Sequence, residues 1–142
     1  MIQVINFTVP GDPVAKGRAR ATMIQGRARL YTPDKTASYE GKAAYLAKMA
    51  MAGMPPLMGP VALSIRAVFA IPASWTKKRL AAHAENPEWV VKKPDADNIV
   101  KIISDAMNGV CWVDDSQVAV LREVVKVYGE VPGVEVKVES LA

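Results

Sequence analysis

The sequence predicts an α/β (α+β) fold in which helices pack on a mixed β-sheet, within a single domain spanning residues 1–142. Segments that alternate apolar and polar residues, as strands do, occur near both ends and in the middle of the chain. Between them lie segments whose apolar residues recur at helical spacing. A chain of 142 residues, 51% of them hydrophobic, is large enough to bury a core, and no linker divides it.

The expected elements follow the order strand, short hairpin, helix, strand, two helices and two strands. Alternating patterns predict strands over residues 2–9, 61–71, 117–128 and 134–138. A Gln25-Gly26 turn is expected to join two further short strands. Helices are predicted over residues 33–51, 75–85 and 97–108. Thr32 or Asp34 is expected to cap the first, Ser74 to cap the second, and Gly109 to end the third.

The composition excludes several classes of site. Cys111 is the only cysteine and His83 the only histidine, so the chain has no internal disulfide, cysteine-rich zinc site or multi-histidine metal site. We expect no membrane span and no signal peptide, and therefore a cytoplasmic protein. The net charge of +4 and the pI of about 9.3 favour an anionic partner such as nucleic acid.

Acidic residues are concentrated in one segment, residues 93–118, which reads KPDADNIVKIISDAMNGVCWVDDSQV. Four of them form two pairs, Asp95/Asp97 and Asp114/Asp115, with Lys101 between the pairs. Clustered carboxylates repel one another unless a cation lies among them. Carboxylates without histidine or thiol ligands suit Mg²⁺ or Mn²⁺, and such an ion promotes phosphodiester hydrolysis. The segment therefore predicts a divalent-metal site that acts on a polyanion.

Each of these residues also has a structural explanation. Asp97 could cap the third helix, and Lys101 could pair with Asp97 or with Asp105 on the same helix face. Asp114 and Asp115 together are also typical of a turn. Taken together, with both pairs close to one predicted helix, the residues favour a metal site over these separate explanations.

A second group of charges lies near the N-terminus. Its cations are Lys16, Arg18, Arg20, Arg27 and Arg29. Gly17 and Gly26 between them allow close approach of the backbone to a ligand. These residues are expected to contact DNA phosphates, although they could also simply keep an irregular segment solvated.

The 93–118 motif resembles the signature of the RusA family of Holliday-junction resolvases, which are common in phages and prophages. The resemblance extends to VPGDPVAKGRAR near the N-terminus and to YTPDKTASYE. It implies a homodimeric, Mg²⁺-dependent endonuclease with a mixed α/β fold that places paired nicks across a four-way DNA junction. The family's catalytic aspartates correspond to Asp95, Asp97 and Asp115, its essential lysine to Lys101, and a neighbouring supporting aspartate to Asp114.

We therefore expect a structure-selective endodeoxyribonuclease of DNA recombination and repair, in a bacterial or phage-infected cell. Asp95, Asp97, Asp115 and Asp114 are the expected Mg²⁺ ligands, Mn²⁺ is expected to substitute, and Lys101 is expected to stabilise charge on the phosphate. The expected partners are branched DNA and a second copy of the chain, with the helix over residues 33–51 as a candidate dimer surface. The alternatives are a flap or fork nuclease, and a junction-binding protein whose metal site is only structural.

Overall fold

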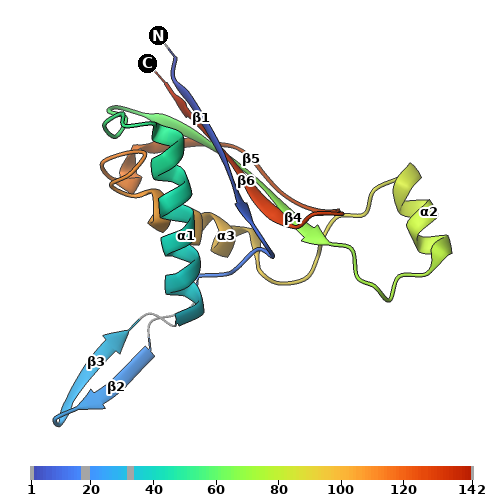
Figure 1. Cartoon of the computed structure of the whole chain (residues 1–142), viewed down its shortest axis with the longest axis horizontal. Coiled ribbons are helices and arrows are strands. Elements are labelled where there is room, and N and C mark those ends of the chain that lie inside the picture. The colour runs from blue at the N-terminus through green and yellow to red at the C-terminus, as the bar shows by residue number, and fades with distance from the viewer. Residues whose placement is uncertain (1, 17–19, 32–33, 142) are drawn as a thin grey trace.

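A computed structural model describes residues 2–16, 20–31 and 34–141, and its centre is a four-stranded mixed sheet (Figure 1). The sheet has the order β1-β6-β4-β5. Its strands are β1 (Val4–Pro10), β4 (Val61–Ala70), β5 (Val118–Gly129) and β6 (Gly133–Ser140). β6 pairs antiparallel with both β1 and β4, whereas β4 and β5 are parallel. The expected α+β architecture with a mixed sheet is confirmed.

Two helices cover one face of this sheet. They are α1 (Asp34–Met51) and α3 (Ala96–Met107). Their buried side chains join those of the strands in one core, which includes Ala43 and Ala47 of α1 and Ile99, Ile102 and Ile103 of α3. The opposite face of the sheet is polar and open, with Arg66 paired to Glu135 across neighbouring strands. Within the described residues, no helix is long and apolar enough to cross a membrane.

The third helix forms where the apolar spacing predicts it. Residues three and four apart on α3 are buried, and Gly109, at φ +79°, follows its end. The observed start, Ala96, lies one residue before the expected one, which places Asp95 at the N-cap. After the helix, the N–H groups of Val110 and Cys111 both donate to the Met107 carbonyl at 2.9 Å, so the chain turns tightly at this end of α3. Cys111 and Trp112 are fully buried there.

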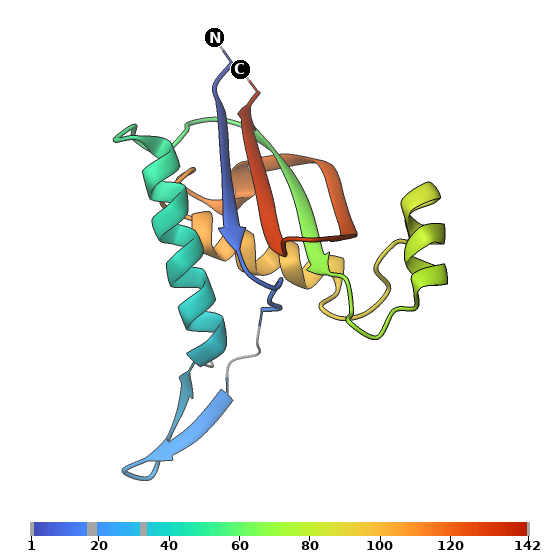
Figure 2. The ribbon, with the colours of Figure 1, turned by 45° about the vertical axis from the view of Figure 1, so that its right-hand side comes forward.

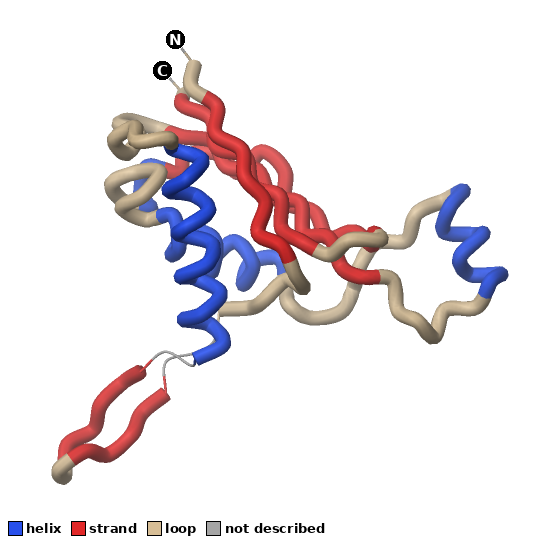
Figure 3. The backbone as a smooth tube through the Cα atoms, in the orientation of Figure 1, coloured by secondary structure: helices blue, strands red, loops and turns tan. Residues whose placement is uncertain are grey.

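Two segments project from the sheet and helices. The hairpin of β2 (Arg20–Ile24) and β3 (Arg27–Tyr31) extends beyond the start of α1 (Figure 3). Its turn residues, Gln25 and Gly26, both have positive φ, as predicted for a two-residue hairpin turn. The other projection carries α2 (Lys77–Glu85), on the far side of the molecule (Figure 1).

Two local expectations were wrong. α2 begins at Lys77, and its N-cap is Thr76, whose Oγ1 accepts a 3.1 Å hydrogen bond from the Arg79 N–H, instead of Ser74. Trp75 is mostly buried, and its packing keeps it outside the helix. Gln117 belongs to a short 3₁₀ helix, η1 (Asp115–Gln117), and not to the strand, because its side chain is bound to the Leu57 and Gly59 carbonyls at 2.8 Å.

Candidate functional site

The first acidic pair lies at the start of α3. Asp95 is the N-cap residue, with φ −69° and ψ 151°, and Asp97 lies in the first turn; both are exposed. Within the described residues, neither carboxylate takes part in a hydrogen bond or an ion pair. Both also lie in the positive potential of the helix N-terminus, which favours bound anions and negatively charged side chains.

The Asp95 side chain does not make the hydrogen bond that an N-cap side chain usually makes. An aspartate at an N-cap normally accepts a hydrogen bond from a backbone N–H of the first turn, which contributes about 1 kcal/mol to stability. The Asp95 side chain makes no such bond although its backbone has the extended N-cap conformation. Its oxygens therefore remain available to a ligand.

The second acidic pair is engaged in local structure. Asp114 caps η1, and its Oδ2 accepts a 3.0 Å hydrogen bond from the Ser116 N–H. Hydrogen bonds from the side chain and backbone of Ser116 hold the pKa of Asp114 below its ordinary value. Asp115 Oδ1 accepts a 2.8 Å hydrogen bond from Nε1 of the buried Trp112. Asp115 thus has one oxygen committed to the fold.

The first pair lies at the start of α3, whereas the second pair lies beyond its other end, where the Gly109 N–H donates to the Trp112 carbonyl. At a rise of 1.5 Å per residue, this 12-residue helix is about 18 Å long. Hydrogen bonds from Cys111 N to the Met107 carbonyl, 2.9 Å, and from Gly109 N to the Trp112 carbonyl, 2.8 Å, hold the following turn against the helix end. Across residues 2–16, 20–31 and 34–141, no three His, Cys, Asp or Glu side chains gather as a group that could hold a metal ion.

Lys101 lies one turn along α3 from Asp97. Its side chain is 62% exposed, and its Nζ lies 3.2 Å from Asp105 Oδ1. Of the two partners that the sequence allowed, Asp97 and Asp105, the structure therefore shows Asp105. The other Asp105 oxygen lies 3.1 Å from the Nζ of Lys16. Asp105 thus joins the candidate catalytic lysine to the segment that follows β1.

Lys16, one of the expected DNA contacts, is held by two acidic side chains. It forms ion pairs with Glu40 of α1 and Asp105 of α3, and the hydrogen bond to Glu40 is the main cause that raises its pKa above the ordinary value. Sequence reasoning missed both partners. They lie 24 and 89 residues away, so only the packing of α1 on α3 could reveal them.

The remaining cations belong to the hairpin or lie outside the described residues. Arg18 falls outside them. In the backbone register of the hairpin, Arg20 lies opposite Tyr31 and Arg29 lies opposite Thr22. Arg27 follows the turn and is exposed. The structure therefore places three of the expected arginines on one projecting hairpin.

Among the described residues, the start of α3 carries two carboxylates without protein partners, and Lys101 is exposed one turn along. A hairpin that holds three arginines projects beyond the start of α1. These features suit a protein that acts on a polyanion. The family model for endodeoxyribonuclease RusA matches residues 10–139. The chain is also 34% identical, over 142 residues, to "Uncharacterized protein YqaN" of Bacillus subtilis strain 168, with 97% of each protein covered. The chain belongs to the RusA endodeoxyribonuclease family, which confirms the resemblance seen in the sequence.

Proposed function

We propose that this member of the family is a Mg²⁺-dependent endonuclease that resolves four-way DNA junctions by paired nicks during recombination and repair. The main supporting observation is the pair Asp95 and Asp97 at the positive end of α3, whose carboxylates have no partner among the residues that the structure describes. Family membership supports the nuclease activity, and branched DNA is the substrate that this family implies.

The donor atoms suit the proposed ion. Asp95, Asp97 and Asp115 offer only hard oxygen ligands, which Mg²⁺ prefers and Mn²⁺ accepts. Mg²⁺ is commonly held by one or two carboxylates together with waters and substrate phosphate oxygens, so Asp95 and Asp97 are sufficient for a first contact. When bound, the ion would polarise the phosphodiester and lower the pKa of a water molecule. Asp114, already bound by Ser116, would have a supporting role.

Lys101 is proposed to stabilise negative charge that develops on the scissile phosphate or on the leaving oxygen. Its ammonium group is exposed and one helical turn from Asp97, so it can reach a phosphate held at the start of α3. Asp105 limits the positions of that ammonium group while leaving it accessible to DNA.

A second copy of the chain would complete the site. The four-way junction has approximate two-fold symmetry, and two opposed nicks require two sites related in the same way. Because the two acidic pairs lie at opposite ends of α3, an antiparallel α3 from a second chain would bring Asp115 of one chain to Asp95 and Asp97 of the other. We propose a homodimer in which each nuclease site draws on both chains.

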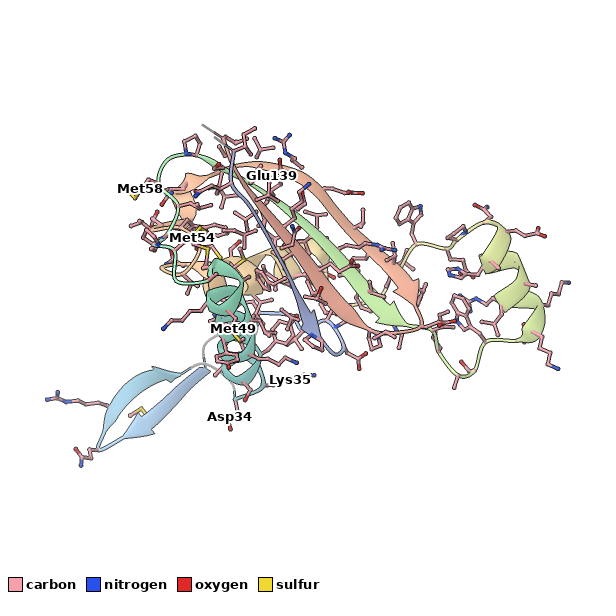
Figure 4. All side chains as sticks on the ribbon, turned by 45° about the horizontal axis from the view of Figure 1, so that its top comes forward. Asp34, Lys35, Met49, Met54, Met58 and Glu139 are labelled. Atoms are coloured by element: carbon pink, nitrogen blue, oxygen red, sulfur yellow. The ribbon has the colours of Figure 1, made fainter. Side chains whose placement is uncertain are left out.

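The C-terminal end of α1 is a candidate for part of the dimer surface. Tyr45 and Met49 of α1 are 64% and 61% exposed and, with Met54, line a groove of about 610 Å³ that also includes Val110. Met49 and Met54 are labelled in Figure 4. Val110 lies just beyond the end of α3, so a chain bound in this groove would lie beside the second acidic pair.

The basic hairpin is proposed to bind DNA phosphates without reading sequence. Arg20, Arg27 and Arg29 would act directly, together with Arg18. Lys16 would contribute only if a phosphate replaced Glu40 or Asp105 as its partner, because both ion pairs are present without DNA.

Cleavage of synthetic DNA branches tests the proposal. A labelled four-way junction, a 5′-flap and a linear duplex of the same sequences are incubated with the protein in Mg²⁺, Mn²⁺ or EDTA. We expect symmetric nicks in opposed strands of the junction, in either metal and not in EDTA. Equal cutting of the flap would favour a less selective nuclease. Junction binding without nicks in either metal would favour the non-catalytic alternative.

A further inference from the structure

The segment from residue 72 to residue 93, here called the α2 limb, has no part in the proposed nuclease site. It stands away from the sheet, on the opposite side of the molecule from the β2–β3 hairpin (Figure 1 and Figure 2). α2 buries none of its nine residues. A helix with no buried side chain gains little from packing, so other contacts must hold it in place.

Contacts at the base of the limb provide that support. The Trp75 ring packs edge-to-face against His83 of α2, at 5.3 Å, and Tyr128 of β5, at 4.8 Å. The Arg79 guanidinium lies over Trp75, 4.0 Å from the ring centroid, and donates two 2.9 Å hydrogen bonds to Glu88. These contacts hold the limb in place although it projects from the sheet.

The limb and the adjoining end of β5 carry cations without acidic partners. They are Lys77, Lys78, Lys92, Lys93 and Lys126, none of which forms an ion pair within the described residues. The Nζ atoms of Lys92 and Lys126 lie 5.9 and 5.6 Å from the centroid of the Phe69 ring. Lys126 Nζ also donates a hydrogen bond to the Lys92 carbonyl, at 2.6 Å. The ammonium groups of Lys92 and Lys126 are therefore held over the same ring, and two like charges held in this way favour an anionic ligand.

An exposed tryptophan lies next to this end of β5, because Trp89 is opposite Val127 in an antiparallel bridge. Val90 is buried, and its N–H donates to the Lys126 carbonyl at 3.2 Å, so the flanking side chains of the extended segment face solvent. Trp89 is 67% exposed and Val91 is 94% exposed. Tryptophan is highly buried on average, and an exposed ring beside lysines is well suited to stack on a nucleic-acid base.

We propose that the α2 limb is a second DNA-binding surface, in which the lysines hold phosphates and Trp89 stacks on a base exposed at the branch point. Lysines alone would fit any polyanion, but the exposed ring adds selectivity for bases that lack a stacking neighbour. Such bases occur at a DNA branch and not within an intact duplex. The limb leads directly to the start of α3, since Lys93 lies two residues before Asp95.

This inference rests on the proposed function and extends it. The basic hairpin and the limb's lysines would bind phosphates of branched and linear DNA alike, whereas Trp89 of the limb would distinguish the two. With the hairpin and the limb on opposite sides of the molecule, one chain would contact DNA at two separated places (Figure 1).

Binding measurements without divalent metal test the limb independently of cleavage. The variants Trp89→Ala and Lys77→Ala/Lys78→Ala are compared with the wild type on two DNAs. One is a four-way junction with 2-aminopurine at its branch point, and the other is a linear duplex. We expect Trp89→Ala to weaken junction binding by roughly tenfold or more, leave duplex binding unchanged and abolish the 2-aminopurine response. The lysine variant should weaken binding to both DNAs and lower the salt slope by about two.

Matched controls come from exposed residues elsewhere. Met58→Ala removes a 78% exposed apolar side chain, and Arg66→Ala/Lys137→Ala removes two exposed cations from the open face of the sheet. We expect both controls to bind as the wild type does. If the wild type binds and cuts junctions while the limb variants match it in affinity, salt slope and fluorescence, the limb proposal is wrong and the proposed function stands. If the wild type binds neither DNA, the proposed function itself fails.

Discussion

The two acidic pairs beside α3 look alike in the sequence and differ in the structure. Asp95 and Asp97 have no partner within the described residues, and Asp95 does not even cap the helix that it precedes. Asp114 and Asp115, in contrast, accept hydrogen bonds from Ser116 and Trp112. The first pair leaves its oxygens free for a ligand, and the second pair organises the turn that follows α3.

Within this one motif, the first pair is available for the proposed chemistry, whereas the second pair stabilises local structure. Removing a carboxylate that stabilises local structure lowers the free energy of unfolding. Removing one without partners changes that free energy little. Stability and activity should therefore respond differently at the two ends of α3.

The largest effect on activity is expected at the first pair. Asp95→Asn and Asp97→Asn should each lower the rate of junction cleavage by roughly 100-fold or more, because a ligand charge beside the scissile phosphate is lost. The free energy of unfolding should change by less than about 1 kcal/mol, since asparagine is also accepted at helix N-caps. Single-turnover cleavage and urea unfolding measure the two quantities. Wild-type cleavage by either variant would remove that residue from the site.

Lys101 tests whether the exposed face between the two pairs takes part in the chemistry. Lys101→Ala should lower turnover by roughly tenfold or more and change junction affinity far less. Lys101→Arg retains the charge without the compact ammonium geometry and should also be impaired. Cleavage rates at saturating protein, together with binding curves, separate the two effects. A fully active arginine variant, with only weaker binding in the alanine variant, would make Lys101 a simple phosphate contact.

At the second pair, the larger effect should be on stability. Asp115→Ala leaves Nε1 of the buried Trp112 without its acceptor, which should cost about 1–3 kcal/mol of unfolding free energy. Asp115→Asn retains an acceptor oxygen and should cost much less while still impairing cleavage. Urea denaturation of both variants provides the comparison. Equal stability of the alanine variant and the wild type would show that the Trp112 bond is not needed for folding.

The smallest expected effect is on the stability of the fold at low pH. The lowered pKa of Asp114 means that its hydrogen bonds with Ser116 stabilise the fold above the ordinary carboxyl pKa. That contribution should be lost as the pH falls below the ordinary value and through the lowered one. Asp114→Asn should therefore show a shallower loss of stability below about pH 4 than the wild type. Thermal unfolding across this range, with Asp97→Asn as the control, checks the sign.

Much of the fold could be predicted because its elements have strong local signals. The spacing of Ile99, Ile102 and Ile103 indicated α3 to within a residue, and Gln25-Gly26 indicated the hairpin. The capping of α2 could not be predicted, because Ser74 and Thr76 are both good caps and the packing of Trp75 decides between them.

The sequence indicates which residues are candidates for the site, and it does not indicate how they are arranged. Two acidic pairs separated by one helix suggested a single cluster, but sequence spacing does not show that the chain turns tightly at the far end of α3. Nor could it show that Lys16 is bound by Glu40 and Asp105, since these contacts depend on how α1 packs against α3. Long-range packing therefore decides which charges are free.

The central claim is that the two pairs act together across two chains, and mixing two inactive variants tests it most directly. Asp97→Asn and Asp115→Asn proteins are unfolded together, refolded as a mixture and assayed for nicking of a four-way junction in Mg²⁺. If each site draws on both chains, a mixed dimer has one site with both substitutions and one with neither, so single-strand nicking should return to a substantial fraction of the wild-type rate. If each site belongs to one chain, every site in the mixture carries a defect. Nicking that stays at the level of the separate variants, despite mixed dimers detected by mass spectrometry, would contradict the account.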